Sequence, residues 1–167
     1  MTEHSPLDDF DHDHELCAAQ LMARAERACA RRNARLTSLR RDVLGAVGES
    51  HRAAGAYEII ERLARSGPRP APISIYRALE FLGDLGLVHR IESRNAFVAC
   101  NRPHEAGRAV LMVCEDCGTV DEIEAASVFD GLDVLAGAEG FETRRAVIEL
   151  SGCCAGCQED DCQEEEA

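Results

Sequence analysis

Residues 89–122 read HRIESRNAFVACNRPHEAGRAVLMVCEDCGTVDE, and the organisation of the whole chain follows from this segment. It contains the pair Cys114-X-X-Cys117, and a second pair, Cys154-X-X-Cys157, lies near the C-terminus. Two thiolates three positions apart can bind one metal ion from a tight turn, and two such turns complete a tetrahedral four-thiolate zinc site. The 36 residues between the pairs exceed the usual zinc-ribbon gap. We therefore expect a folded domain, rather than a hairpin, to bring the two pairs together.

The two cysteine pairs also admit a redox interpretation or an unrelated pairing. A redox Cys-X-X-Cys motif usually stands alone beside a βαβ unit, and this chain has two such pairs. Cys153 directly precedes Cys154, but only Cys154 stands three positions before Cys157. We therefore leave out Cys153 and the more distant Cys162, and predict a structural zinc site formed by Cys114, Cys117, Cys154 and Cys157.

Four further side chains in the opening segment could bind a second metal ion: His89, Cys100, His104 and Glu122. One thiolate, two imidazoles and a carboxylate suit Zn(II), and with fewer thiolates this set should release the ion more readily. Each residue also has an ordinary interpretation. His89 could be a half-buried strand residue, Cys100 a small apolar one and Glu122 a surface acid.

Composition narrows the class of protein. The chain has 167 residues, enough for one ordinary domain or two small ones. It has no apolar run of transmembrane length, and its acidic N-terminus is unlike a targeting peptide, so we expect a cytoplasmic protein with no membrane association. Nine cysteines in a reducing compartment favour metal ligation over disulfides. We do not expect an enzyme, because a zinc hydrolase needs an open coordination position and the second candidate site already has four ligands.

The charge is unevenly distributed. The net charge is −13, yet residues 17–98 carry 14 Arg against 8 acids, and Lys is absent. Acidic segments lie on both sides of this basic region. The pattern is typical of a DNA-contacting domain joined to an acidic partner domain, although ordinary surface charge explains it about as well.

Periodicity predicts an α/β (α+β) protein whose first domain is a winged helix-turn-helix. We expect helices at Leu16–Arg32, Ser38–Val47 with Thr37 as N-cap, Ala56–Arg65, and Ser74–Leu85 with Ser74 as cap and Gly86 after its end. The segment Gly67–Pro72 should be a turn. Strands at Leu87–Ile91 and Ala96–Cys100, with a hairpin turn at 93–95, would form the wing. In this plan the helix before the wing enters the DNA major groove.

The second domain is expected to be a small α/β unit. We predict strands at Ala109–Val113, Val120–Ile123 and Phe141–Leu150, with a helix at Ala126–Ala136. The predicted organisation is a disordered acidic tail at 1–15, the winged-helix domain at 16–100, a linker at 101–108, the second domain at 109–157 and a disordered acidic tail at 158–167. Cys17 and Cys29 are expected to be packing residues or free thiols.

The chain resembles the ferric uptake regulator family and, within it, the zinc uptake regulators. The similarity covers about residues 20–157. The segments that carry it are residues 28–37 (ACARRNARLT), 56–57 (AY), 75–82 (IYRALEFL), 86–93 (GLVHRIES), 113–118 (VCEDCG) and 154–157 (CAGC).

The resemblance implies a zinc-sensing transcriptional repressor of zinc-import genes with no small-molecule substrate. It implies a homodimer of winged-helix and α/β dimerisation domains that binds palindromic, AT-rich operator DNA. It also implies two Zn(II) per chain, a structural ion at the four cysteines and a regulatory ion at His89, Cys100, His104 and Glu122. Tyr57 and Arg77 match positions that such regulators use on DNA bases. Ser74 and Tyr76, from the same predicted helix as Arg77, complete the candidate DNA-binding set.

One difference from other members of the family indicates which metal is bound. Iron and peroxide sensors of this family usually carry a His-rich run before the first cysteine pair, and here the corresponding segment contains only His104. Together with Cys100 as a thiolate ligand, this favours zinc over iron. An iron- or peroxide-sensing repressor and a thiol-redox-switched regulator remain the alternatives.

Overall fold

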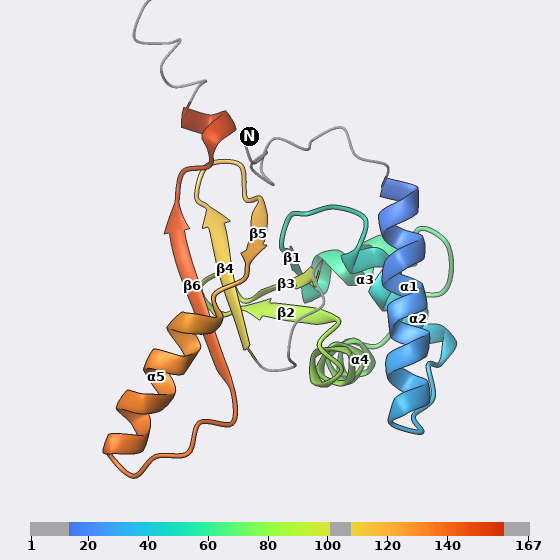
Figure 1. The fold of residues 1–167 in the computed structure, drawn as a ribbon. Coiled ribbons are helices and arrows are strands. Elements are labelled where there is room, and N and C mark those ends of the chain that lie inside the picture. Colours follow the sequence, from blue (N-terminus) through green and yellow to red (C-terminus); the bar gives the residue numbers. More distant parts are fainter. Residues whose placement is uncertain (1–13, 101–107, 159–167) are drawn as a thin grey trace, which may run out of the picture.

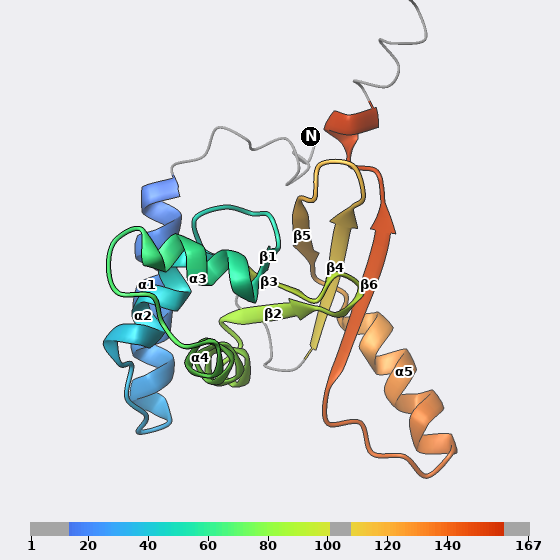
Figure 2. The same ribbon diagram turned by 180° about the vertical axis from the view of Figure 1, so that it is seen from behind.

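The computed structural model describes the backbone of residues 14–100 and 108–158, with side chains from residue 17 onward. Its elements form two groups, shown in Figure 1 and from behind in Figure 2. The elements of the first group are α1 (His14–Arg31), α2 (Ser38–Val47), β1 (Ala54–Gly55), α3 (Ala56–Ala64), α4 (Pro72–Asp84), β2 (Val88–Ile91), the 3-10 helix η2 (Glu92–Arg94) and β3 (Ala96–Ala99). Those of the second group are β4 (Arg108–Cys114), β5 (Val120–Ile123), α5 (Ala126–Ala138) and β6 (Ala146–Gly152).

The mixed α/β fold class predicted from the sequence is confirmed. The predicted tails at 1–15 and 158–167 and the predicted linker at 101–108 fall almost entirely outside the described residues. Within the described part of the chain, every helix is too short or too polar to cross a bilayer.

The helices of the first group enclose one hydrophobic core. Apolar side chains from α1, α2, α3 and α4 meet the sheet β1-β3-β2 there, and the largest fully buried ones include Leu44, Ile59, Ile75 and Leu82. Helix α2 has the predicted bounds, and Thr37 caps it by accepting a hydrogen bond from the Arg40 backbone N–H at 3.4 Å. The two-residue strand β1 was not predicted. A strand this short has no side-chain period to detect.

Helix α4 begins two residues earlier than the sequence suggested. Pro72 occupies the first turn and Ala71 is the N-cap, so the prediction that Ser74 caps this helix is wrong. Proline is favoured at this position because the first N–H groups of a helix have no intrahelical partner, and its ring presets the helical φ. The predicted end is confirmed, since Gly86 follows the C-cap Leu85 with φ +69°.

The hairpin of β2 and β3 is buried on both faces, except at the exposed Arg90. Its turn is the 3-10 helix η2 closed by Asn95 in a left-handed conformation (φ +46°), rather than a simple three-residue turn. Phe97 and Ala99 face the helical core, whereas Ile91 and Val98 belong to a second core shared with β4 and β5. The hairpin is therefore the packing layer between the two groups of elements.

The second group is a three-stranded sheet in the order β5-β4-β6 with α5 beside it (Figure 1). Strand β4 pairs antiparallel with β5 and parallel with β6, in a ladder that runs from Arg108↔Ala146 to Cys114↔Gly152. The strand predicted at Phe141–Leu150 therefore starts five residues too early and ends two too early. Its ladder with β4 begins only at Ala146, and Phe141 instead follows the turn that ends α5 and is exposed.

Backbone contacts join the two groups directly. Arg52 forms a bridge with Thr119, and the Val120 N–H donates to the His51 carbonyl at 2.9 Å. Arg94 of η2 donates to the Cys114 carbonyl at 2.9 Å. The loop that contains Cys114 is thus in contact with the first group of elements, residues 14–99, which forms the winged-helix part of the molecule.

Candidate metal centres and nucleic-acid interface

The parallel pairing of β4 and β6 brings the two cysteine pairs together. Cys114 ends β4 and Cys117 lies in the turn before β5, while Cys154 and Cys157 follow the end of β6. The four Sγ atoms all lie within 4.8 Å of one another. The Sγ atoms of Cys114 and Cys157 are 3.8 Å apart, and those of Cys117 and Cys154 are 3.7 Å apart.

These separations fit a zinc ion. Four sulfurs at about 2.3 Å from zinc in a tetrahedron lie about 3.8 Å from one another. All four residues are free thiols rather than disulfides. The donor set and its spacing therefore suit a closed tetrahedral site with no open position.

Local backbone geometry stabilises the thiolate form at Cys114. Burial raises the pKa of this thiol, but hydrogen bonds from the backbone N–H groups of Cys117, Cys154 and Asp116 outweigh burial and lower the pKa to about 6. Conversely, the pKa of Cys157 is raised, first by its contact with Cys154 and then by burial. Four thiolates this close together repel one another, so full ionisation of the cluster requires a bound cation.

Cys153 belongs to an overlapping group with Cys114, Asp116 and Cys157. Asp116 is exposed, and its Oδ2 atom lies 4.0 Å from the Cys114 sulfur. The group that contains the buried Cys154 has four sulfur ligands instead of three sulfurs and a carboxylate. The Cys154 N–H also donates to the Cys114 sulfur at 3.3 Å. A four-thiolate set is the better match to zinc.

A second cluster lies between the hairpin and the sheet of the second group. His89 on β2, Cys100 just after β3, and Glu122 on β5 each place a ligand atom within 4.8 Å of the others. All three are buried, with exposed fractions of 6%, 1% and 5%. The interpretation of Glu122 as a surface acid, and of His89 as half-buried, is therefore wrong. His104, the fourth predicted ligand, lies outside the described residues.

Contacts within this second cluster favour the protonated form of His89. The His89 Nε2 atom is 3.5 Å from Glu122 Oε1. Burial lowers the pKa of His89, but its contacts with Cys100 and Glu122 outweigh burial and raise the pKa above its ordinary value. A buried imidazole, thiol and carboxylate that converge on one point form a ligand set for a borderline cation such as Zn(II).

The predicted DNA-binding residues lie on two helices. Tyr57 on α3 is 65% exposed and Tyr76 on α4 is 41% exposed. Arg77 is exposed and Ser74 is half-buried in the first turn of α4. Ile73, which was not singled out from the sequence, is also exposed at the start of α4.

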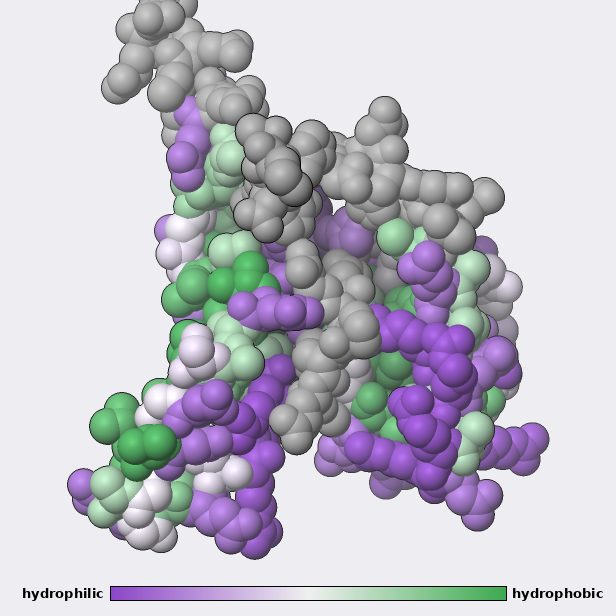
Figure 3. Space-filling model, in the orientation of Figure 1, coloured by the Kyte–Doolittle hydropathy of each residue, from purple (hydrophilic) through white to green (hydrophobic). Residues whose placement is uncertain are grey.

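The second group carries an exposed apolar surface. Val128, Leu132 and Leu135 recur at helical spacing along α5, and Phe129 is the only buried residue of this helix. Figure 3 shows hydrophobic side chains over α5, whereas the helical half is mainly hydrophilic in the same view. The other exposed large apolar residues of the second group are Val134, Phe141 and Leu150.

Most of the sequence matches a known family. The model of the "Ferric uptake regulator family" matches residues 31–151. The chain belongs to this family. Membership confirms the resemblance read from the sequence, and it confirms that the protein is a regulator rather than an enzyme.

Within the ferric uptake regulator family, zinc regulators are among the similar relatives. The "Zinc uptake regulation protein" of Escherichia coli (strain K12) is 39% identical over 141 residues, which cover 84% of this chain and 82% of the relative. A solved "Zinc Uptake Regulator Complexed With Zinc AND DNA" superposes with a TM-score of 0.82 at 38% identity, covering 87% of this chain and 97% of that chain. The "Peroxide-responsive repressor PerR" of Staphylococcus epidermidis is 23% identical over 92% of this chain and 96% of the relative.

Proposed function

We propose that this protein is a zinc-responsive repressor that binds operator DNA and controls zinc-uptake genes. The buried cluster of His89, Cys100 and Glu122 carries the proposal, because it joins the winged-helix part to the second sheet. Similarity to a zinc uptake regulator that was solved with zinc and DNA supports both ligands. The cytoplasm, where DNA and reduced thiols coexist, is the compartment that fits these features.

The two clusters support a content of two zinc ions per chain. Cys114, Cys117, Cys154 and Cys157 would hold the structural ion, which contributes directly to folding free energy. His89, Cys100 and Glu122, with His104 from the undescribed segment, would hold the regulatory ion. Sulfur donors number four in the first set and one in the second, so the second ion should exchange more easily.

The regulatory ion would act by shifting a conformational population. Its ligands lie on β2, after β3 and on β5, so a bound cation links the wing to the second sheet. An ion that binds this arrangement better than a splayed one raises the population of the bound arrangement, by no more than its differential affinity. The existing contacts of Arg52 and Arg94 with the loop at 114–119 would act in the same direction.

DNA recognition would use the exposed end of α4. A winged-helix protein places this helix in the major groove, where Arg77 can donate to guanine or a phosphate. Tyr57, Ser74 and Tyr76 would complete the contact surface. Two such surfaces, held at fixed separation in a homodimer, match the half-sites of a palindromic, AT-rich operator.

The apolar face of α5 is the surface that would form the homodimer. Its residues Val128, Leu132 and Leu135 are too exposed to serve the monomer core. Contiguous apolar surface of this kind typically marks a protein interface. In this arrangement residues 16–100 act as the DNA-binding domain and residues 109–157 as the dimerisation domain.

The test couples zinc content to DNA binding. The DNA probe is a duplex selected from a random-sequence pool by the zinc-loaded protein. We expect one zinc per chain to resist a mild chelator while a second leaves and takes DNA binding with it. DNA binding that survives loss of the labile zinc would refute the regulatory role, and an oxidant titration would then examine the thiol-redox alternative.

Matched cysteine variants separate the two sites. Cys100→Ser should abolish zinc-dependent DNA binding and retain the resistant zinc, whereas Cys117→Ser should lose the resistant zinc and the fold. Cys153→Ser is the control, because Cys153 lies beside the cluster but outside the four-sulfur set. If Cys153→Ser lost the resistant zinc and Cys117→Ser did not, the structural site would have to be reassigned to the overlapping group.

A further inference from the structure

Arg24 of helix α1 reaches Cys100, 76 residues later in the chain. One guanidinium nitrogen donates to the Cys100 carbonyl at 2.6 Å, and the other terminal nitrogen donates to the Cys100 sulfur at 3.2 Å. The planar guanidinium group of Arg24 therefore binds both the backbone carbonyl and the sulfur of Cys100. No feature of the sequence around Arg24 pointed to this contact.

Arg24 projects from a rigid base. Its neighbours Leu21 and Ala25 are buried in the helical core, with exposed fractions of 8% and 0%, and they attach α1 to the winged-helix part. Arg24 itself is half-buried. A long side chain loses less freedom on binding when its base is already packed and its fork is planar.

Cys100, by contrast, lies just beyond the regular ladder. The last paired residues of the hairpin are Val88 and Ala99, and the Cys100 N–H donates to the Leu87 carbonyl at 2.9 Å. The two hydrogen bonds from Arg24 complete the attachment on the carbonyl side and at the sulfur. They hold the sulfur in the group that it forms with His89 and Glu122.

We propose that Arg24 is a positioning residue of the regulatory metal site, which orients the Cys100 sulfur toward the ion and connects helix α1 to it. This inference rests on the proposed function, because it assumes that the cluster binds zinc. Groups that hydrogen-bond to metal ligands fix the ligand orientation and tune the metal, and their loss typically lowers metal affinity about 10- to 100-fold. Lysine cannot replace Arg24, because a single ammonium does not reproduce the planar fork.

The experiment uses the full chain with zinc retained at the four-cysteine site and Co(II) added to the second site. The sulfur-to-cobalt charge-transfer band then reports Cys100 alone. We compare the wild type with Arg24→Gln, Arg24→Lys and the control Arg27→Gln. Arg27 is exposed on the same helix and makes no side-chain polar contact within the described part of the chain.

We expect Arg24→Gln and Arg24→Lys to bind Co(II) and zinc about 10- to 100-fold more weakly in chelator competition. Their charge-transfer band should move to longer wavelength, because the sulfur loses a hydrogen-bond donor. A residue that served only helix packing would leave the band unmoved. Arg27→Gln should match the wild type in both measurements.

Either of two results would overturn the inference. One is an Arg24→Gln protein whose affinity and band equal those of the wild type. The other is an equal loss in Arg27→Gln, which would assign the effect to the general charge of α1. Retention of the resistant zinc verifies that each variant is folded. A wild-type protein with no labile metal coupled to DNA binding would instead refute the proposed function, so the two failures are distinguishable.

Discussion

Glu149 of β6 connects the second sheet to the wing. Its two carboxylate oxygens accept hydrogen bonds from the backbone N–H groups of Glu92 at 2.5 Å and Ser93 at 3.2 Å. These are the first residues of η2, where helical N–H groups have no partner of their own. Burial raises the pKa of Glu149, but the contacts with Ser93 and Glu92 outweigh burial and lower the pKa below its usual value.

The lowered pKa of Glu149 predicts how the free energy of unfolding depends on pH. A carboxyl group whose pKa is lower in the folded state contributes stability above its unfolded pKa, and loses that contribution as the pH falls through the folded value. Glu149→Gln should therefore reduce the free energy of unfolding of the zinc-loaded protein by about 1 kcal/mol at pH 7. The difference from the wild type should shrink as the pH falls below about 4.5. Denaturant titrations at a series of pH values measure it.

The control for Glu149 is Glu142→Gln. Glu142 is exposed and accepts no hydrogen bond from the described residues. Equal effects of the two substitutions, or a Glu149 effect that persists undiminished at low pH, would contradict the assigned role of the carboxylate.

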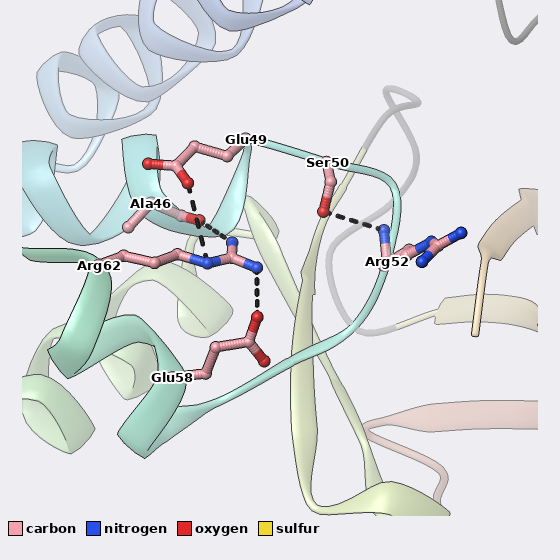
Figure 4. A network of polar contacts seen from close by, with 6 residues as sticks. All are labelled: Ala46, Glu49, Ser50, Arg52, Glu58 and Arg62. Atoms are coloured by element: carbon pink, nitrogen blue, oxygen red, sulfur yellow. Dashed lines mark hydrogen bonds and ion pairs between the residues drawn. The ribbon is translucent and has the colours of Figure 1, made fainter. Parts of the chain in front are cut away.

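At the scale of elements, Arg62 connects α3 to the end of α2. It donates to the Ala46 carbonyl at 2.6 Å and to Glu58 at 2.5 Å, with Glu49 at 3.8 Å (Figure 4). The carbonyl belongs to the last turn of α2, where backbone acceptors lack intrahelical donors and a cation is favoured. The two glutamates are more than half exposed, so they contribute less than the hydrogen bond to the carbonyl.

Arg62→Ala should therefore lower the free energy of unfolding by about 1 to 2 kcal/mol. Most of the loss should remain in high salt, because salt screens the exposed ion pairs but not a hydrogen bond to the carbonyl of the buried Ala46. Arg65→Ala, at the exposed C-cap of the same helix, should change the free energy by less than about 0.5 kcal/mol. Denaturation with and without 1 M salt tests this, and a loss that disappears in salt would mean that the ion pairs dominate.

At the scale of the whole molecule, the exposed face of α5 is the proposed homodimer interface. Leu135 is 68% exposed in the single chain. If this face forms the dimer, Leu135→Glu buries an unpaired charge and should weaken dimerisation at least about tenfold. Sedimentation equilibrium measures the shift toward monomer.

The control for α5 is Ile73→Glu. Ile73 is similarly exposed, at 60%, but lies on α4 away from this face. It should remain dimeric. A Leu135→Glu protein that dimerised as strongly as the wild type would place the interface elsewhere.

Local signals in the sequence were sufficient to locate the helices to within a few residues and to identify the cysteine pairs and the family. The bounds of α2, the N-cap Thr37 and Gly86 after α4 depend on neighbours a few residues away, so local chemistry predicts them. The same holds for Cys114-X-X-Cys117 and Cys154-X-X-Cys157, because a tight turn alone determines the geometry of each pair. The start of α4 was predicted two residues too late because Ser74 and Pro72 are both residues that favour a helix start, and the helix begins at Pro72.

The tertiary structure alone decided which of these segments meet. The parallel register of β4 and β6 brings the second cysteine pair to the first, and that register is a contact between distant parts of the chain. Packing of the hairpin against the second sheet buries both His89 of β2 and Glu122 of β5, which a local polarity pattern cannot reveal. The contact of Arg24 with Cys100 spans 76 residues. Side-chain period and ligand spacing are local properties of a sequence, whereas register, burial and long-range hydrogen bonds depend on how all the elements pack at once.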